Sequence, residues 1–412
     1  MKKSDTLIKE TAGWLSVVGF DWMLVMCIFS REVVPSNVAN LGYFLFGVPW
    51  LVEMIMNGRW RYHFRIEHLL SYAMILFFVF ELIYLPNEGD IYLKKLMEKR
   101  YPLLLFAVTG LFGYSSKLTY KRVVDTMVAV SALAVIAVIV NAGVWHLIVG
   151  PGRTTAFSES RTAIVNTHMM FNFYLNAAFI GMWWIWFRCG EKSKWRGVLY
   201  SAATLLTLFA LVFGDGRSGL LIFIALVITF VSIGCWGRLR WKTLLILVLL
   251  VGIGSAAVMC NARFRQYSFH NEAREGYWKA AFELIEKKPL MGYGVNNAQE
   301  EYDKVNMKYQ TDDMPHLWYI ENNCTFIDTH NQFIQTTLEF GLIGLLVLLS
   351  LYILPAVVAG NKRRSLAMFI VAISLLQSMT DMFITGQFCT LYCILTQAAI
   401  AFSQGIRQPI SC

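Results

Sequence analysis

Long apolar runs recur along almost the whole sequence, and most are close to the length that a helix needs to cross a lipid bilayer. A hydrocarbon core of about 30 Å takes roughly 20 helical residues, and a segment inside lipid must satisfy its own backbone hydrogen bonds. Hydrophobic residues make up 57% of the 412 residues and charged residues only 15%, far from the composition of soluble domains. The sequence therefore predicts an all-α integral membrane protein.

We expect about twelve transmembrane helices in one polytopic membrane domain that covers residues 1–412. The first run lacks a small-residue cleavage site and is interpreted as a retained helix. The loop between the ninth and tenth helices, residues 260–332, is the large exception among short connections. The expected spans are 12–30, 40–56, 69–85, 101–116, 123–142, 166–187, 198–213, 220–235, 243–259, 333–357, 366–383 and 389–404.

Lys and Arg are concentrated in every second short loop, and cytoplasmic loops carry this excess in membrane proteins. Both termini are therefore expected in the cytoplasm, and the loop 260–332 on the opposite side. The basic stretch 92–100 breaks the pattern, since it falls outside, and is interpreted as an interfacial helix. The net charge of +9 follows mainly from these loops. Membrane lipids, and no nucleic acid, are the expected partners.

Polar chemistry is concentrated in the loop 260–332. Apolar residues recur at helical spacing in 271–288, which predicts an amphipathic helix that ends at Pro289. A glycine-containing turn follows, and 297–310 is expected to form a second short helix. The stretch "IDTHNQFIQTTLEF" then leads into the tenth span, with Asp328 or Thr329 as its cap and His330 in its first turn.

Four arginines share the expected outer side with His330: Arg217 in "FGDGRSGLL", Arg274 in the amphipathic helix, and Arg153 and Arg161 in "GPGRTTAFSESRTA". A guanidinium group keeps its charge and binds phosphate oxygens bidentately. Convergent arginines therefore suit a phosphate or diphosphate. The alternative is that the arginines pair with lipid headgroups or carboxylates, and that the histidine is a solvated or capping residue.

No motif indicates a metal or a cofactor. "TDDMPH" holds two carboxylates and a histidine but matches no ligand spacing. The eight cysteines show no zinc pattern, and most fall in or beside spans, where a reduced thiol is expected. Cys260 and Cys324 share the large loop, and a disulfide between them is a hypothesis that the sequence leaves open.

Three stretches resemble the O-antigen ligase and O-antigen polymerase family of bacterial membrane glycosyltransferases: "GDGRSGLL", "REGYWKAAFELIEKKPLMGYGVNN" and "THNQFIQTTLEFGLIG". They occur in the family's order over about the C-terminal half. By this resemblance Arg217, Arg274 and His330 match the family's functional residues. Gly216 stands where serine is common, and the region of Arg153 is reduced to "RTTAFSES", which makes it the weaker match.

The resemblance implies transfer of a glycan from a polyprenyl (undecaprenyl) diphosphate carrier to an acceptor hydroxyl, without a metal, at the periplasmic face of the bacterial inner membrane. The acceptor is a lipid core in a ligase or the glycan itself in a polymerase, and the sequence favours neither. His330 would act as the base and the arginines would bind the diphosphate. Nearby arginines are expected to keep the imidazole neutral, and a single displacement with inversion is expected.

A transporter or flippase of lipid-linked glycans is the alternative function. Ionisable residues near the bilayer midplane mark transport pathways. Asp21 and Glu53 fall inside predicted spans, and Glu81, Asp125 and Asp381 lie towards span ends. Pairing within the helix bundle or at an interface is the competing interpretation for all five. Essential residues at the outer surface would favour transfer, whereas an essential Asp21 or Glu53 would favour transport.

Overall fold

The structure, a computed structural model, describes residues 2–30, 33–59, 61–83, 90–143, 164–189, 193–214, 216–235, 273–309 and 328–401. These residues are mostly helical and contain no β-strand, apart from one isolated bridge between Phe29 and Val165. The chain divides into two compact units that alternate along the sequence. One comprises Met1–Trp60, Tyr114–Tyr267 and Gly405–Cys412, and the other Arg61–Gly113 and Ser268–Gln404.

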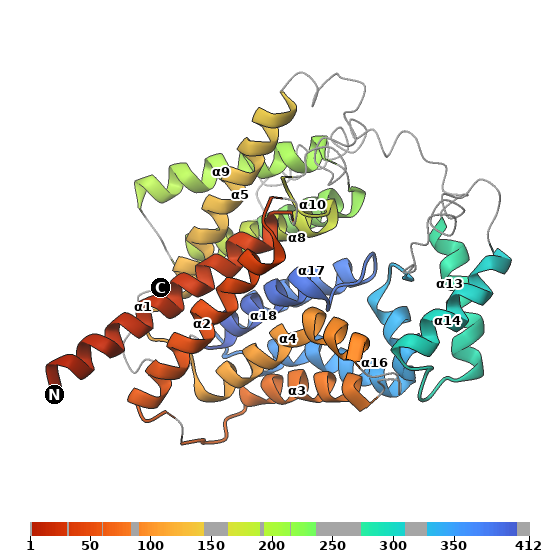
Figure 1. The fold of residues 1–412 in the computed structure, drawn as a ribbon. Helices are drawn as coiled ribbons and strands as arrows, with labels where there is room; N and C mark the ends of the chain where they lie inside the picture. Colours follow the sequence, from red (N-terminus) through yellow and green to blue (C-terminus); the bar gives the residue numbers. More distant parts are fainter. Residues whose placement is uncertain are drawn as a thin grey trace. The chain divides into compact units, whose positions relative to one another are not determined.

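Helices of the first unit are shown with their labels in Figure 1. They are α1 (Lys2–Ile28), α2 (Ser36–Met56), α5 (Tyr120–Ala142), α8 (His168–Trp183) with a π-helical turn at Trp184–Arg188, α9 (Lys194–Phe213) and α10 (Arg217–Cys235). α1 and α2 pack at backbone distance, since a Cβ added to Gly19 would lie 2.2 Å from the Phe46 nitrogen. Small residues permit such close helix pairs in membranes.

Acidic residues of the first unit pair with arginines on neighbouring helices. The Asp21 carboxylate of α1 lies 2.7 Å from Arg122 at the start of α5. Asp125, one turn further along α5, lies 2.8 Å from Arg196 of α9. The prediction that Asp21 and Asp125 pair within the bundle is confirmed.

The second unit carries the remaining helices. They are α3 (His68–Ile83), α4 (Asp90–Phe112), α13 (Ala273–Lys287), α14 (Val295–Asn306) with a 3₁₀ turn at Met307–Tyr309, α16 (Gln332–Val358), α17 (Arg364–Ser378) and α18 (Gly386–Ala401). α16 packs against α3, α13 and α17, while α4 packs against α3 and α18. α13 and α14 lie side by side (Figure 1).

The helical membrane fold is confirmed in its coarse form. Eleven of the twelve expected spans coincide with described helices, and the ninth, 243–259, lies outside the described residues. Among the described helices, five are long and apolar enough to cross a membrane. They are Ser4–Ile28, Ser36–Met56, Tyr120–Asn141, Lys194–Phe213 and Gln332–Val358. The count of twelve stays a prediction.

The basic stretch 92–100 does not form a separate helix, contrary to the expectation. α4 runs without interruption from Asp90, so this stretch forms the first turns of the helix that was expected to begin at 101. Its last residue, Arg100, is buried and lies 3.1 Å from the equally buried Glu81 of α3. The buried carboxylate of α3 and the cation at the end of the basic stretch thus neutralise each other. The pairing expected for Glu81 is confirmed.

Both helices expected in the large loop are present as α13 and α14. They share a small hydrophobic core with Leu338 of α16. Tyr277, Leu284 and Tyr302 are its largest members, and the Tyr302 hydroxyl donates to the Tyr277 carbonyl. The described part of the loop is therefore a folded layer attached to α16. The core also contains Ala280, Ala281, Ala298 and Val305.

Cysteine predictions are tested only in part. Among the described residues, Cys27, Cys189, Cys389 and Cys393 are thiols outside any disulfide, as expected in or beside spans. The pair proposed for a disulfide, Cys260 and Cys324, lies outside the described residues, as does "TDDMPH".

Candidate active site

His330 lies in a tight turn immediately before α16. The helix begins at Gln332, and its cap is Asn331, whose side-chain oxygen accepts hydrogen bonds from the backbone of Phe333 and Ile334 at 3.0 and 3.2 Å. The prediction that Asp328 or Thr329 caps the helix, with His330 inside its first turn, is therefore wrong. The cap falls at Asn331 because its extended backbone lets the side chain reach both N–H groups.

The backbone of His330 has a left-handed conformation, with φ at 48°. A residue with a side chain rarely adopts this conformation and does so at a cost of about 1–3 kcal/mol. The Asp328 side chain stabilises the turn by accepting a hydrogen bond of 2.8 Å from the His330 N–H. Such strained residues cluster at functional sites, where the surrounding structure holds them in place.

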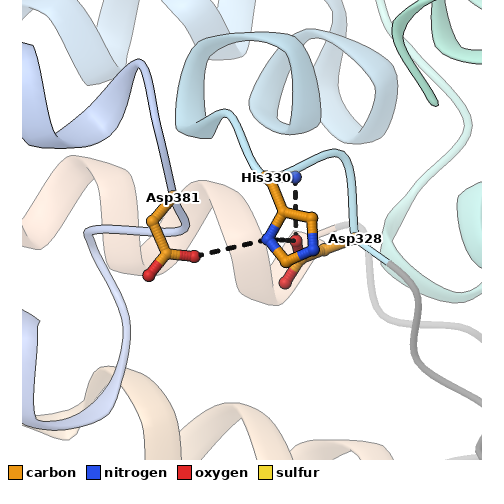
Figure 2. Close-up of side chains that lie close together, drawn as sticks. All are labelled: Asp328, His330 and Asp381. Carbon is orange, nitrogen blue, oxygen red and sulfur yellow. Dashed lines mark hydrogen bonds and ion pairs between the residues drawn. The ribbon is translucent and has the colours of Figure 1, made fainter. Parts of the chain in front are cut away.

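Two carboxylates face the same ring nitrogen of His330 (Figure 2). Nδ1 lies 3.4 Å from an oxygen of Asp328 and 3.7 Å from an oxygen of Asp381. These are ion-pair distances, somewhat longer than a normal hydrogen bond. They favour the tautomer that carries its proton on Nδ1, because both neighbouring groups are acceptors. That tautomer leaves Nε2 as the basic nitrogen.

The surroundings raise the pKa of His330 above its usual value of 6.5. Burial lowers the pKa, but the interaction with the Asp381 carboxylate and the charge of Asp328 raise it by more. Arg274 lowers the pKa, as expected for a nearby arginine, yet its effect is the smallest of these. The net direction is therefore opposite to the one expected from nearby arginines, because the carboxylates of Asp381 and Asp328 act on the imidazole more strongly than Arg274 does.

A chain of side chains ties the His330 turn to α16. The backbone N–H of Thr329 donates to the Gln335 side chain at 3.1 Å, and the Gln335 amide donates to the Glu339 carboxylate at 2.7 Å. All three residues are buried. Glu339 orients Gln335, and Gln335 in turn fixes the backbone beside His330. These contacts explain why the first turns of α16 are polar although the rest of the helix is apolar.

Gln332 holds the backbone of the turn that carries Asp381. This aspartate lies in the turn between α17 and α18, after α17 has ended at Ser378. The buried Gln332 oxygen accepts from the backbone of Phe383 and Ile384 at 2.9 and 2.8 Å. Asn331 also donates to the carbonyl of Met379 in the same turn at 3.3 Å. Both halves of the histidine–carboxylate contact are therefore held by the first residues of α16.

α13 covers the other side of the His330 turn. The Trp278 indole donates to the Thr329 carbonyl at 3.0 Å, and the Tyr277 ring centroid lies 5.9 Å from that of His330. Arg274 lies one turn earlier on α13, near enough for its charge to act on the imidazole. Within this unit the structure therefore brings Arg274 into the neighbourhood of His330.

α16 is interrupted at Gly341, whose φ of 64° and ψ of −165° are not helical. The segment after α13 fills the break. Leu342 and Ile343 donate to the carbonyls of Pro289 and Leu290 at 2.8 and 3.4 Å, respectively. In a continuous helix these two amides would instead donate to the carbonyls of Leu338 and Glu339. Those carbonyls accept from the backbone N–H groups of Tyr293 and Gly294 at 3.0 and 2.7 Å, respectively. Four exchanged backbone bonds thus join the loop to the helix.

Two glycines make this exchange possible. A Cβ at Gly341 would lie 2.2 Å from the backbone of Leu290, and a Cβ at Gly292 would lie 2.5 Å from the backbone of Glu339. Both residues also have positive φ. The glycine turn expected after Pro289 is confirmed, and its function is to let the two backbones meet.

The other predicted site residues are not all placed. Arg217 is the first residue of α10, in the first unit, rather than within the preceding turn. Arg153 and Arg161 lie outside the described residues. Sequence reasoning missed Asp381 as a site residue and interpreted it as an aspartate near a span end. No spacing in the sequence connects Asp381 to His330. Its position between two apolar runs is the signal that could have identified it as a candidate site residue.

A comparison with protein families now tests the resemblance. Residues 202–349, a little more than a third of the chain, match the family model described as O-antigen ligase. The resemblance to the O-antigen ligase family is confirmed. The O-antigen ligase segment includes Arg217, Arg274 and His330, and it ends before Asp381. A search of curated proteins found no match to the chain.

Proposed function

We propose that this protein transfers a glycan from a polyprenyl diphosphate carrier to an acceptor hydroxyl, with His330 as the general base. The observation that carries the proposal is the contact of His330 Nδ1 with Asp328 and Asp381. His330 and Asp328 lie in the segment that matches the O-antigen ligase family, and Asp381 follows that segment in the chain. A base whose second nitrogen is held by a carboxylate is oriented for proton transfer and stabilised when it becomes charged. The coarse activity, that of an O-antigen ligase-like glycosyltransferase, agrees with the family match.

In the proposed reaction the acceptor oxygen attacks the anomeric carbon of the donor sugar, and the bond between that carbon and the diphosphate oxygen breaks. His330 Nε2 takes the hydroxyl proton, while Nδ1 keeps its own proton between the two carboxylates. The electron pair of the broken bond leaves with the polyprenyl diphosphate. No covalent glycosyl-enzyme is needed, so one displacement inverts the anomeric centre.

Negative charge that develops on the leaving diphosphate requires fixed cations. Arg274 is the first candidate, because its charge acts on the His330 imidazole. Arg217 remains a candidate by its match to the family, and Arg153 and Arg161 are weaker ones. We propose that the site faces the periplasm of a bacterial inner membrane, where a lipid-linked donor keeps its isoprenoid in the bilayer.

Reconstitution tests the proposal and separates its two forms. The purified protein would be incorporated into vesicles with a polyprenyl diphosphate glycan and either a lipid-core or a glycan acceptor. A ladder of products indicates a polymerase, and a single transferred block indicates a ligase. Carrier release without any glycosidic product, with every acceptor offered, would refute the transferase.

Metal independence is part of the proposal and needs its own test. One ligand atom each from Asp328, His330 and Asp381 lies within 4.8 Å of the others, so this cluster has the composition of a divalent cation site. Turnover that is unchanged in EDTA supports proton transfer by the histidine. Loss of turnover in EDTA that Mg²⁺ or Mn²⁺ restores would instead assign the cluster to a metal.

Transport of a lipid-linked glycan remains the second candidate because one buried acid of the first unit forms no ion pair with the residues that the structure describes. Glu53 of α2 is 5% exposed, and its Oε2 has no hydrogen-bond partner within the part of the chain that the structure describes. Asp21, in contrast, pairs with Arg122. If Glu53→Gln abolishes product formation while His330→Ala does not, transport is favoured over transfer.

A further inference from the structure

We propose that the segment Pro289–Gly292, named here the loop tip, inserts its apolar side chains into the hydrocarbon of the bilayer at one membrane surface. α14, in the same loop, carries many acidic, basic and amide side chains. The loop tip differs, since Leu290 is 62% exposed and Met291 is 53% exposed. Two neighbouring apolar residues are therefore more than half exposed.

The level of the loop tip in the membrane follows from its bonds to α16. Its carbonyls at Pro289 and Leu290 accept from Leu342 and Ile343. From Leu342 to Val358 the helix contains no charged residue, and this stretch spans about 25 Å at 1.5 Å per residue. A hydrocarbon core is about 30 Å thick. The core must therefore begin close to Leu342, which is the residue bonded to the loop tip.

Exposed apolar residues of α16 continue the same surface. Leu342 and Ile343, joined to the loop tip through the backbone, are exposed, and Leu346 follows one turn later with 67% exposure. On a helix long and apolar enough to span the membrane, such side chains face lipid. The loop tip therefore extends a lipid-facing surface, and the groups that contact it are the acyl chains of the bilayer.

Charge on the neighbouring residues fits this position. Lys287 and Lys288 directly precede the loop tip and are exposed. Lysines at a membrane boundary place their ammonium groups among the lipid headgroups while their stems lie along apolar surface. The break in α16 also suits the boundary, because irregular backbone near lipid is tolerated when protein groups satisfy it. The four exchanged bonds do this.

Insertion of the loop tip would fix the height of α13 above the bilayer and therefore the height of Arg274 and the His330 turn. The inference depends on α16 crossing the membrane and not on the transfer reaction. It can fail while the proposed function stands, and the reverse also holds.

Photocrosslinking tests the occupant directly. The photoreactive residue p-benzoylphenylalanine would replace Met291 in the full-length protein, reconstituted in vesicles of phosphatidylethanolamine and phosphatidylglycerol. Ile343, on α16, is the positive control, and Asn297, exposed on α14, is the matched control on the same loop. After irradiation, peptide mass spectrometry would detect phospholipid adducts. We expect adducts at positions 291 and 343 and at least tenfold fewer at 297.

Three results would overturn the inference. One is a lipid adduct at 343 with none at 291, which would place the loop tip in water. The second is an adduct between position 291 and another protein chain, which would make the surface a protein interface. The third is equal lipid labelling at 291 and 297, which would show contact without insertion.

Discussion

His330 and Asp381 belong to different parts of the chain, yet an oxygen of the Asp381 carboxylate lies 3.7 Å from the Nδ1 of the imidazole. The aspartate follows α17 and the histidine precedes α16, and Gln332 of α16 holds the turn that carries the aspartate. A charge relationship of this kind controls the basicity of the imidazole. Most of the following predictions depend on it.

Replacement of His330 by alanine should lower the transfer rate by roughly 10²–10⁴-fold, which is the usual contribution of a positioned general base. The fold should persist, because the hydrogen bond from the backbone N–H of residue 330 to Asp328 does not need the imidazole ring. The rate would be measured as glycan transferred in reconstituted vesicles. His63→Ala, at an exposed position, is the control. Full activity of the His330 variant would remove the base assignment.

Asp381→Asn should move the acid limb of the kcat/KM profile to lower pH. Asp381 raises the pKa of His330 above 6.5, so the neutral base forms in the native protein only as pH rises through that elevated pKa. Without the carboxylate charge the pKa falls, and the base becomes available at lower pH. The maximal rate should also fall, because the imidazolium formed in the reaction is less stabilised. Asp303→Asn on α14 is the control, and an acid limb that stays in place would contradict the assignment.

Arg274→Gln should shift the same acid limb in the opposite direction. The arginine lowers the pKa of His330, so its loss lets the pKa rise. Arg274→Lys keeps the charge and should leave the limb nearly unchanged, while the loss of the guanidinium fork should weaken donor binding. Measurement of KM for the donor alongside the pH profile separates the two effects. Wild-type values of both in the lysine variant would favour a headgroup contact.

Gly341→Ala should destabilise the protein by several kcal/mol, because the added Cβ would lie 2.2 Å from the backbone of Leu290 and φ is 64°. The joint between the loop and α16 would have to open. Thermal unfolding in detergent would show a lower Tm. Gly360→Ala is the matched control, since a Cβ there meets nothing within 4 Å. Equal Tm values for the two variants would show that the joint is not needed for stability.

Gln332→Leu should reproduce part of the Asp381 phenotype without a change of charge. The backbone amides of Phe383 and Ile384 would lose a buried acceptor, at a cost of about 1–3 kcal/mol for each amide left unsatisfied. The turn that carries Asp381 would then move, and the acid limb should again shift to lower pH. Lys304→Met, at an exposed position of α14, is the control. An unchanged pH profile would mean that the turn holds Asp381 without Gln332.

Much of the helical framework was accessible from the sequence. Apolar runs and helical spacing predicted α5, α13 and α16 close to their observed bounds, because both signals are local and burial in lipid or in a core enforces them. The sequence predicts that this helix begins at 101, because the charged stretch 92–100 is interpreted as a separate interfacial helix, whereas α4 begins at Asp90. The buried pair of Arg100 with Glu81 removes that argument, and a partner on another helix cannot be read from local composition.

At the site, the sequence by itself selected His330 and Arg274, through motifs that resemble the O-antigen ligase family. It could not select Asp381, since the contact with His330 exists only after α16, α17 and α18 have packed. The sequence also suggested the wrong direction for the imidazole pKa. Electrostatic effects depend on distance, and the tertiary structure places the carboxylates of Asp328 and Asp381 within 4 Å of Nδ1. The sequence thus determined which groups are present, while packing decided which of them act on one another.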